Sequence, residues 1–114
     1  MTNNLLIVTD NTQDVAVMNV KGRVDSNTAP ELDSALENLL KSDKNKIVLN
    51  LEAVEYLSSA GLRALVKALK DAQKSGGDVR LASVSEPIEV ILRTVGMLQM
   101  FKMFSNSEEA VAGF

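Results

Sequence analysis

The sequence predicts an α/β fold: a mixed sheet of four to five strands, with an antiparallel hairpin at its N-terminal edge, and three to four helices. Two observations support this fold class. Short runs rich in Val, Ile and Leu alternate along the chain with segments whose apolar residues recur at i, i+3, i+4 and i+7. The runs are typical of strands, and the spaced residues are typical of amphipathic helices. Because strands that alternate with helices favour parallel pairing through right-handed crossovers, most of the sheet is expected to be parallel.

The hairpin is predicted from two apolar runs with a short polar connection. Residues 5–8 and 15–20 have the composition of strands, and residues 10–14 form a polar turn between them. Such a short connection favours antiparallel pairing. A polar loop over residues 22–27 follows the second strand.

The first helix is expected to begin near Thr28. Thr28 and Glu31 have the spacing of a capping box, and Pro30 falls in the first turn, where its missing N–H does no harm. The apolar stripe of this helix comprises Leu32, Ala35, Leu36 and Leu39.

A central strand and a second helix follow. Residues 47–51 are apolar apart from Asn50, which favours a strand covered on both faces. Gly76 and Gly77 supply the end of the next helix. The apolar stripe of that helix comprises Leu62, Leu65, Val66 and Leu69. Its other faces carry basic residues that are expected to be solvated rather than to bind nucleic acid or lipid: Arg63, Lys67, Lys70 and Lys74.

The C-terminal part is expected to add two strands and two helices. The strands cover residues 79–82 and 100–104, and the helices are capped by Ser85 and Ser107, the first of them ending at Gly96. The stripe of the third helix comprises Ile88, Ile91, Leu92 and Val95. A cluster near the last strand is expected to close the core, with a Met-rich binding surface as the alternative: Met97, Leu98, Met100, Phe101, Met103 and Phe104. Without a linker or repeat, residues 1–114 are expected to form one domain.

Composition narrows the function classes. The 114 residues include 12 basic and 15 acidic side chains, a net charge of −3, which argues against direct DNA binding. The chain has no Cys and no His, which excludes a Ser-His-Asp triad and Cys- or His-ligated metals. We therefore expect a protein that is not an enzyme and that needs no metal or cofactor. Apolar runs of about five residues are too short to span a bilayer, and no leader is apparent, so we expect a cytoplasmic protein without membrane insertion.

The most informative segment is residues 56–62, YLSSAGL, which joins the central strand to the second helix. Ser58 and Ser59 lie where free backbone N–H groups and the positive end of a helix dipole favour a negative charge. A serine at this place can serve as an N-cap or as a phosphate acceptor, and the local sequence favours the cap for Ser59. Gly61 can let the loop lie close to the sheet or let a kinase approach the backbone.

The order of these pieces resembles the STAS domain, and most of all the bacterial anti-sigma factor antagonists. The resemblance is carried by residues 47–51, the Ser58–Leu62 loop, the Gly22-Arg23-Val24-Asp25 turn, and a tail with Val95-Gly96-Met97-Leu98 and residues 107–110. It implies a small α/β domain that works as a phosphorylation-controlled switch. In that family, the unphosphorylated antagonist binds an anti-sigma factor that is also a GHKL-type serine kinase, and this frees the sigma factor. Phosphorylation of a serine ends the binding, and a serine phosphatase restores it.

The resemblance also implies residue roles. The family's acceptor lies two positions before the loop glycine, which is Ser59 here, with Ser58 as the competing acceptor. Ser58 stands where many members carry Asp, so the mode of kinase recognition stays open. The expected partner-binding residues are Asp25, Asn27, Ser58, Ala60, Gly61 and Leu62, although Asp25 can equally fix the turn before the first helix.

Two other functions remain as alternatives. The same fold can be a scaffold subunit of a larger signalling or transport complex, which would bind its partners whatever the state of Ser59. A small hydrolase or nucleotide-binding protein is the alternative from another class, and it lacks His, Cys and a phosphate-binding loop.

Overall fold

The computed structural model describes residues 5–114, which form a five-stranded sheet, four α-helices and a 3₁₀ helix. The strands are β1 (Leu6–Thr12), β2 (Val15–Val24), β3 (Lys46–Leu57), β4 (Asp78–Ala82) and β5 (Met103–Phe104). The helices are α1 (Ala29–Lys41), α2 (Ser59–Lys74), α3 (Glu86–Thr94), the 3₁₀ helix η1 (Leu98–Met100) and α4 (Ser107–Ala112).

The strands lie in the sheet in the order in which they occur in the chain. β1 pairs with β2 antiparallel, and β2, β3, β4 and β5 pair in parallel. β3 is therefore the central strand, as its continuous apolar run predicts. The expected mixed sheet with an antiparallel N-terminal edge is confirmed.

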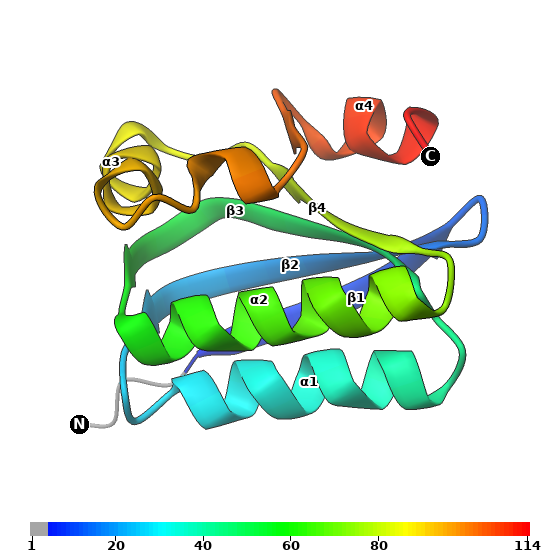
Figure 1. Ribbon diagram of the computed structural model, residues 1–114, viewed down its shortest axis with the longest axis horizontal. Coiled ribbons are helices and arrows are strands. Elements are labelled where there is room, and N and C mark those ends of the chain that lie inside the picture. The colour runs from blue at the N-terminus through cyan, green and yellow to red at the C-terminus, as the bar shows by residue number, and fades with distance from the viewer. Residues whose placement is uncertain (1–4) are drawn as a thin grey trace.

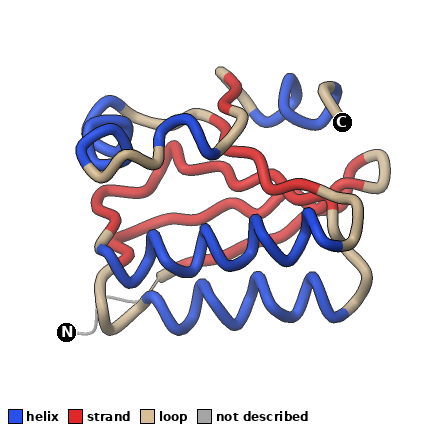
Figure 2. Tube along the Cα trace, viewed as in Figure 1, coloured by secondary structure: helices blue, strands red, loops and turns tan. Residues whose placement is uncertain are grey.

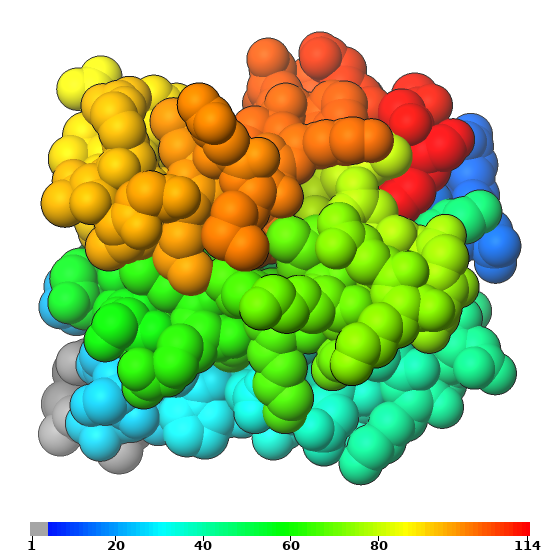
Figure 3. Space-filling model, viewed as in Figure 1, coloured from blue at the N-terminus to red at the C-terminus, as the bar shows by residue number. Residues whose placement is uncertain are grey.

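The helices cover the sheet in two unequal groups. α1 and α2 lie side by side along one face, and their stripes pack with Ile47, Leu49 and Leu81 in the larger core (Figure 1). α4 covers the other face, where Ala110 and Val111 belong to a smaller apolar cluster. α3 packs against β3 and lies above it in the same view (Figure 2). On the surface, α2 forms a band between α1 and the segment that contains α3 and η1 (Figure 3).

Two strands are longer than expected, and the extension shapes the site. Residues 22–24, expected in a loop, belong to β2, and β3 continues to Leu57 rather than ending at residue 51. The two extensions pair with one another, Gly22 with Val54 after a first register shift and Val24 with Leu57 after a second. The apolar pattern of β3 is interrupted at the first shift, where Glu52 and Ala53 are exposed.

Several expected helix ends are wrong in detail. Thr28 is the N-cap of α1 but makes no capping hydrogen bond, so the capping box does not form. Ser85 is the N-cap residue of α3 as expected but makes no side-chain capping hydrogen bond. α4 is capped by Asn106, whose Oδ1 accepts from the Glu109 N–H at 2.8 Å, rather than by Ser107. α3 ends at Thr94, so Val95 lies outside the stripe and is 51% exposed.

The C-terminal Met and Phe cluster mainly completes the core. Phe101 is buried in the larger core, with side chains of the neighbouring segment packed against it, whereas Met100 is 41% exposed. The last strand is only two residues long: Met100 belongs to η1, and residues 101–102 connect η1 to the strand. No helix among residues 5–114 combines the length and apolar character needed to cross a bilayer.

The β1–β2 turn offers a test of local backbone strain. Gln13 and Asp14 form the two-residue connection and both have positive φ, 50° and 68°. Asn-Gly adopts this conformation more readily than Gln-Asp. We expect the double substitution Gln13→Asn with Asp14→Gly to raise the free energy of unfolding by about 0.5–1 kcal/mol in urea titrations. Asp71→Gly, inside α2, serves as the control and should lower it by about 0.3 kcal/mol, because Gly has a lower helix propensity than Asp; a gain at both positions would refute the strain at this turn.

Candidate functional site

Two loops meet at the carboxyl ends of β2 and β3. The pairing of Val24 with Leu57 brings the β2–α1 connection beside the β3–α2 junction, and the Ser58 N–H donates to the Val24 carbonyl at 2.7 Å. The loops at the carboxyl ends of parallel strands commonly carry function in such folds. The expected site residues at positions 25 and 58 therefore directly follow two neighbouring strands.

Ser58, and not Ser59, is the N-cap of α2. Its Oγ accepts a hydrogen bond from the Gly61 N–H at 3.2 Å, and its carbonyl accepts from the Leu62 N–H at 2.9 Å. Ser58 is half-buried and has extended backbone dihedrals, as an N-cap should. The expectation that Ser59 caps the helix in its resting state is wrong, because the helix begins one residue earlier than that role requires, at Ser59 itself.

Ser59 is the first residue of α2, and its side chain is exposed. Within residues 5–114 its hydroxyl makes no hydrogen bond to another protein group. The first turn of α2 contains no acidic residue, so nothing there offsets the positive end of the helix dipole. An added negative charge on Ser59 would be favoured by about 0.3–1 kcal/mol at this position.

Asp25 fixes the turn that precedes α1. Its Oδ1 accepts from the backbone N–H groups of Asn27 at 2.9 Å and Thr28 at 3.0 Å. The buried Thr28 hydroxyl accepts from the Asp25 N–H at 2.9 Å and donates to the Arg23 carbonyl at 2.7 Å. The Thr28 N–H is the main cause of the lowered pKa of the Asp25 carboxyl. Of the two roles left open for Asp25, the structure shows the turn-fixing one, which leaves Oδ2 for other contacts.

Gly61 lets α2 approach the sheet closely. A Cβ on Gly61 would lie 2.6 Å from Val24 Cγ1 and 2.8 Å from Leu57 Cδ1. Both Gly61 and Leu62 are buried, whereas Asn27 is exposed and Ala60 is half-buried. Thus Gly61 and Leu62 position the loop, and the exposed surface of the site comes from their neighbours.

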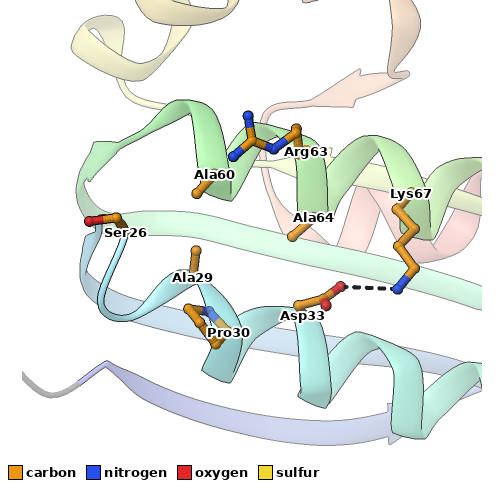
Figure 4. Close-up of a pocket in the computed structure, with 8 residues that line it drawn as sticks. All are labelled: Ser26, Ala29, Pro30, Asp33, Ala60, Arg63, Ala64 and Lys67. Atoms are coloured by element: carbon orange, nitrogen blue, oxygen red, sulfur yellow. Dashed lines mark ion pairs between the residues drawn. The ribbon is translucent and has the colours of Figure 1, made fainter.

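A groove between α1 and α2 adjoins this loop (Figure 4). It has a volume of about 270 Å³. Its lining consists of Ser26, Ala29, Pro30, Asp33, Ala60, Arg63, Ala64 and Lys67. Three of these are alanines, so the groove has a small-residue floor with charged side chains around it.

The charged residues of the groove differ in their partners. Lys67 bridges to α1, with Nζ 3.8 Å from Asp33 and 3.3 Å from Glu37. The Glu37 hydrogen bond is the main cause of the raised pKa of Lys67, and Lys41 followed by Lys67 lowers the pKa of Glu37. Arg63 is exposed, makes no ion pair within residues 5–114, and extends along α2 toward Ala60 (Figure 4). The basic side of α2 is therefore solvated as expected, except at Lys67.

Comparison with known proteins identifies the family. The sequence model of the family that is described as STAS domain matches residues 7–110 of this chain. The chain belongs to the STAS domain family. Among its relatives, this STAS domain is 30% identical over 105 residues to the anti-sigma-F factor antagonist RsfB of Mycobacterium tuberculosis, covering 87% of this chain and 80% of that protein.

Solved structures share the fold of this STAS domain. An anti-sigma factor antagonist from Mycobacterium paratuberculosis superimposes with a TM-score of 0.86 at 23% identity, over 96% of this chain and 92% of that one. The phosphorylated form of the Bacillus cell fate determinant SpoIIAA superimposes with a TM-score of 0.74 at 16% identity, over 94% and 97% of the two chains.

Two features of the site escaped the sequence analysis. Arg23 of β2 stacks on Tyr56 of β3, with the guanidinium carbon 4.7 Å from the ring centroid. This pair lies opposite in register one step before Val24 and Leu57, so a periodicity confined to one strand could not reveal it. The other feature is the role of the Thr28 hydroxyl, which hydrogen-bonds to the Asp25 N–H and the Arg23 carbonyl in the turn. The spacing of Thr28 and Glu31 had suggested a capping box instead.

The lowered pKa of Asp25 generates a pH prediction. Because the folded-state pKa lies below the ordinary 3.8, the carboxylate contributes stability above that value, and the contribution is lost as the pH falls through the folded-state pKa. We expect Asp25→Ala to lower Tm at neutral pH, and the difference from the wild type to narrow below pH 3.8. Asp10→Ala, at an exposed position of β1, is the control. A Tm difference that stays constant across this range would contradict the assignment.

The close approach at Gly61 generates a packing prediction. Gly61→Ala should lower the free energy of unfolding by about 1–3 kcal/mol, because Val24 and Leu57 must move. Val24→Ala removes one of the obstructing methyl groups, so the double variant should cost less than the sum of the single ones. Denaturant titrations of all four proteins give the coupling. Strict additivity would show that the contact does not set the position of α2.

Proposed function

We propose that this STAS domain is a phosphorylation-regulated anti-sigma factor antagonist that acts in the cytoplasm. With Ser59 unphosphorylated, it binds an anti-sigma factor that is also a GHKL-type serine kinase, and the sigma factor is released. Phosphorylation of Ser59 ends the binding, and a serine phosphatase reverses it. The domain acts by binding protein partners rather than by catalysis or contact with DNA. One observation carries the proposal: an exposed, unengaged Ser59 hydroxyl at the start of α2, two residues before the buried Gly61.

The choice of Ser59 over Ser58 follows from what each oxygen does. The Ser58 Oγ accepts the Gly61 N–H, so a phosphate there would have to replace the N-cap. The Ser59 Oγ is free to attack the γ-phosphorus of ATP in the kinase, losing its proton to a base on the kinase as ADP leaves. The product adds about 1.5–2 negative charges at pH 7. Because these charges lie at the positive end of α2, the fold tolerates them.

The phosphate would act on the docking surface rather than on the fold. It would lie between the Asp25 turn and the α1–α2 groove, where a partner must cover it to bind. A doubly charged group covered there by a partner would lose its hydration, and one neighbouring cation would neutralise only part of its charge. Arg63 lies four residues after Ser59 on α2, within reach of a phosphate on the same helix face. An ion pair between the phosphate and Arg63 would keep the phosphate at the surface of the domain and would neutralise only part of its charge.

The relatives support the proposal at the level of role and fold. RsfB, by its name, acts on an anti-sigma factor, and SpoIIAA has been solved in a phosphorylated form. At 16% identity, SpoIIAA supports only the statement that this fold accommodates a phosphate. That Ser59 is the phosphate acceptor, and that a kinase and a phosphatase act on it, is our proposal.

Substitution at Ser59 separates the switch from a fixed scaffold. Using the kinase that co-purifies with the tagged wild-type protein, we expect Ser59→Asp to weaken binding by at least about tenfold, since a single charged defect at an interface readily costs 1.4 kcal/mol. Ser59→Ala should bind normally and take up no phosphate. Calorimetric titration measures the affinity, and mass spectrometry after incubation with ATP locates the phosphate.

Ser58→Ala is the matched control. It removes the N-cap, so it should lower stability by about 1 kcal/mol while leaving phosphorylation at position 59 intact. Phosphate found on Ser58 would overturn the assignment of the acceptor. Equal affinities of the wild type and Ser59→Asp would instead support the scaffold alternative.

A further inference from the structure

A second cavity lies at the other end of α2 from Ser59. It has a volume of about 430 Å³, and it opens where β3 and β4 begin. Its lining comprises Lys46, Gln73, Gly76, Gly77, Asp78, Arg80, Met100, Lys102 and Phe114. Since an α-helix rises about 1.5 Å per residue, Gln73 lies roughly 20 Å along α2 from Ser59. The cavity is therefore separate from the proposed switch, and a ligand bound in it would not depend on that switch.

Positive charge is concentrated in this cavity. Lys46 from β3, Arg80 from β4 and Lys102 just before β5 all line it, and Asp78 is the single acidic side chain among the lining residues. The whole chain has a net charge of −3, whereas this cavity has a local excess of two positive side chains. Such a cluster attracts small anions.

Arg80 makes the cavity more than a pair of surface lysines. Its side chain is only 8% exposed, and its Nε donates to Asp78 Oδ2 at 3.1 Å. Its Nη1 is buried and has no hydrogen-bond partner among the described residues. Burying a charged group is costly, and both the ion pair with Asp78 and the Phe114 ring, 3.8 Å from the guanidinium carbon, offset that cost. Asp78 compensates the charge of Arg80, so the excess positive charge of the cavity is that of Lys46 and Lys102.

The geometry divides the roles of the cations. The C-terminal segment covers Nη1, because a Cβ on Gly113 would lie 3.1 Å from that atom. The Arg80–Asp78 ion pair therefore belongs to the wall of the cavity, and the exposed Lys46 and Lys102 are the cations that a bound anion could reach. Met100 and Phe114 add apolar surface beside them.

We propose that this cavity binds a small phosphate-bearing molecule through Lys46 and Lys102, with the Arg80–Asp78 pair forming its wall. Two excess positive charges match a phosphate group, which carries 1.5 to 2 negative charges at about pH 7, better than a single carboxylate. The volume admits a phosphate with a small organic group attached.

Pyrophosphate is the probe, titrated into the isotope-labelled full chain while amide NMR spectra are recorded. We expect saturable shifts of the amides of Gly76, Gly77 and Lys102 with a Kd of about 1 mM or below, at constant ionic strength. The amides of Ser59 and Ala60 should not move. Citrate, which offers carboxylates only, should bind at least about tenfold more weakly. Absence of saturation, or equal binding of citrate, would overturn the proposal.

Variants of the exposed lysines avoid the risk that an Arg80 variant fails to fold. Lys46→Glu combined with Lys102→Glu should abolish saturable pyrophosphate binding. Lys70→Glu, an exposed lysine of α2 that does not line the cavity, changes the net charge in the same direction and should bind like the wild type. Equal loss in both variants would show that only overall charge matters and would refute the site.

Discussion

The arrangement of the site depends on the contact between the first turn of α2 and the ends of β2 and β3. Gly61 has no side chain, so the helix backbone can lie against Val24 and Leu57. This contact is continued by the hydrogen bond from the Ser58 N–H to the Val24 carbonyl, which ties the junction to the neighbouring strand. Because these contacts fix the start of α2 against the sheet, the side chain of its first residue, Ser59, faces solvent.

Two adjacent hydroxyls thereby take different roles, and the backbone decides which. Ser58 has extended dihedrals and turns its Oγ back to the Gly61 N–H, whereas Ser59 is already helical and turns its side chain to solvent. A modification of Ser59 therefore leaves the capping bond intact. A switch built in this way changes a surface without changing the structure below it, which is consistent with rigid packing beneath and a charge-sensitive partner above.

The sequence predicted the fold better than it predicted the site. The order of helices and strands could be predicted from the stripes of α1, α2 and α3 and from the apolar run at residues 47–51. This was possible because the buried residues of helices and strands recur at characteristic spacings. The length of β3 and the cap at Ser58 were missed, since both depend on partners far along the chain: the first on the register with β2, the second on which residue the sheet allows to become helical. The Arg80 cavity is lined by four segments that are distant in the sequence. No local sequence pattern predicts that they come together.

The two ends of α2 are expected to act independently. Coupling between distant sites needs an element with two arrangements that each ligand favours differently. α2 is instead packed along its length into one core, with buried residues from Leu62 to Ala72, and Lys67 bridges to Asp33 and Glu37 of α1 in the middle. Shifting or rotating α2 would disrupt this packing and these ion pairs, so binding at one end of the helix is not expected to move the other end. The Ser59 surface and the Arg80 cavity would then respond to different signals, one read by a protein partner and the other by a small anion.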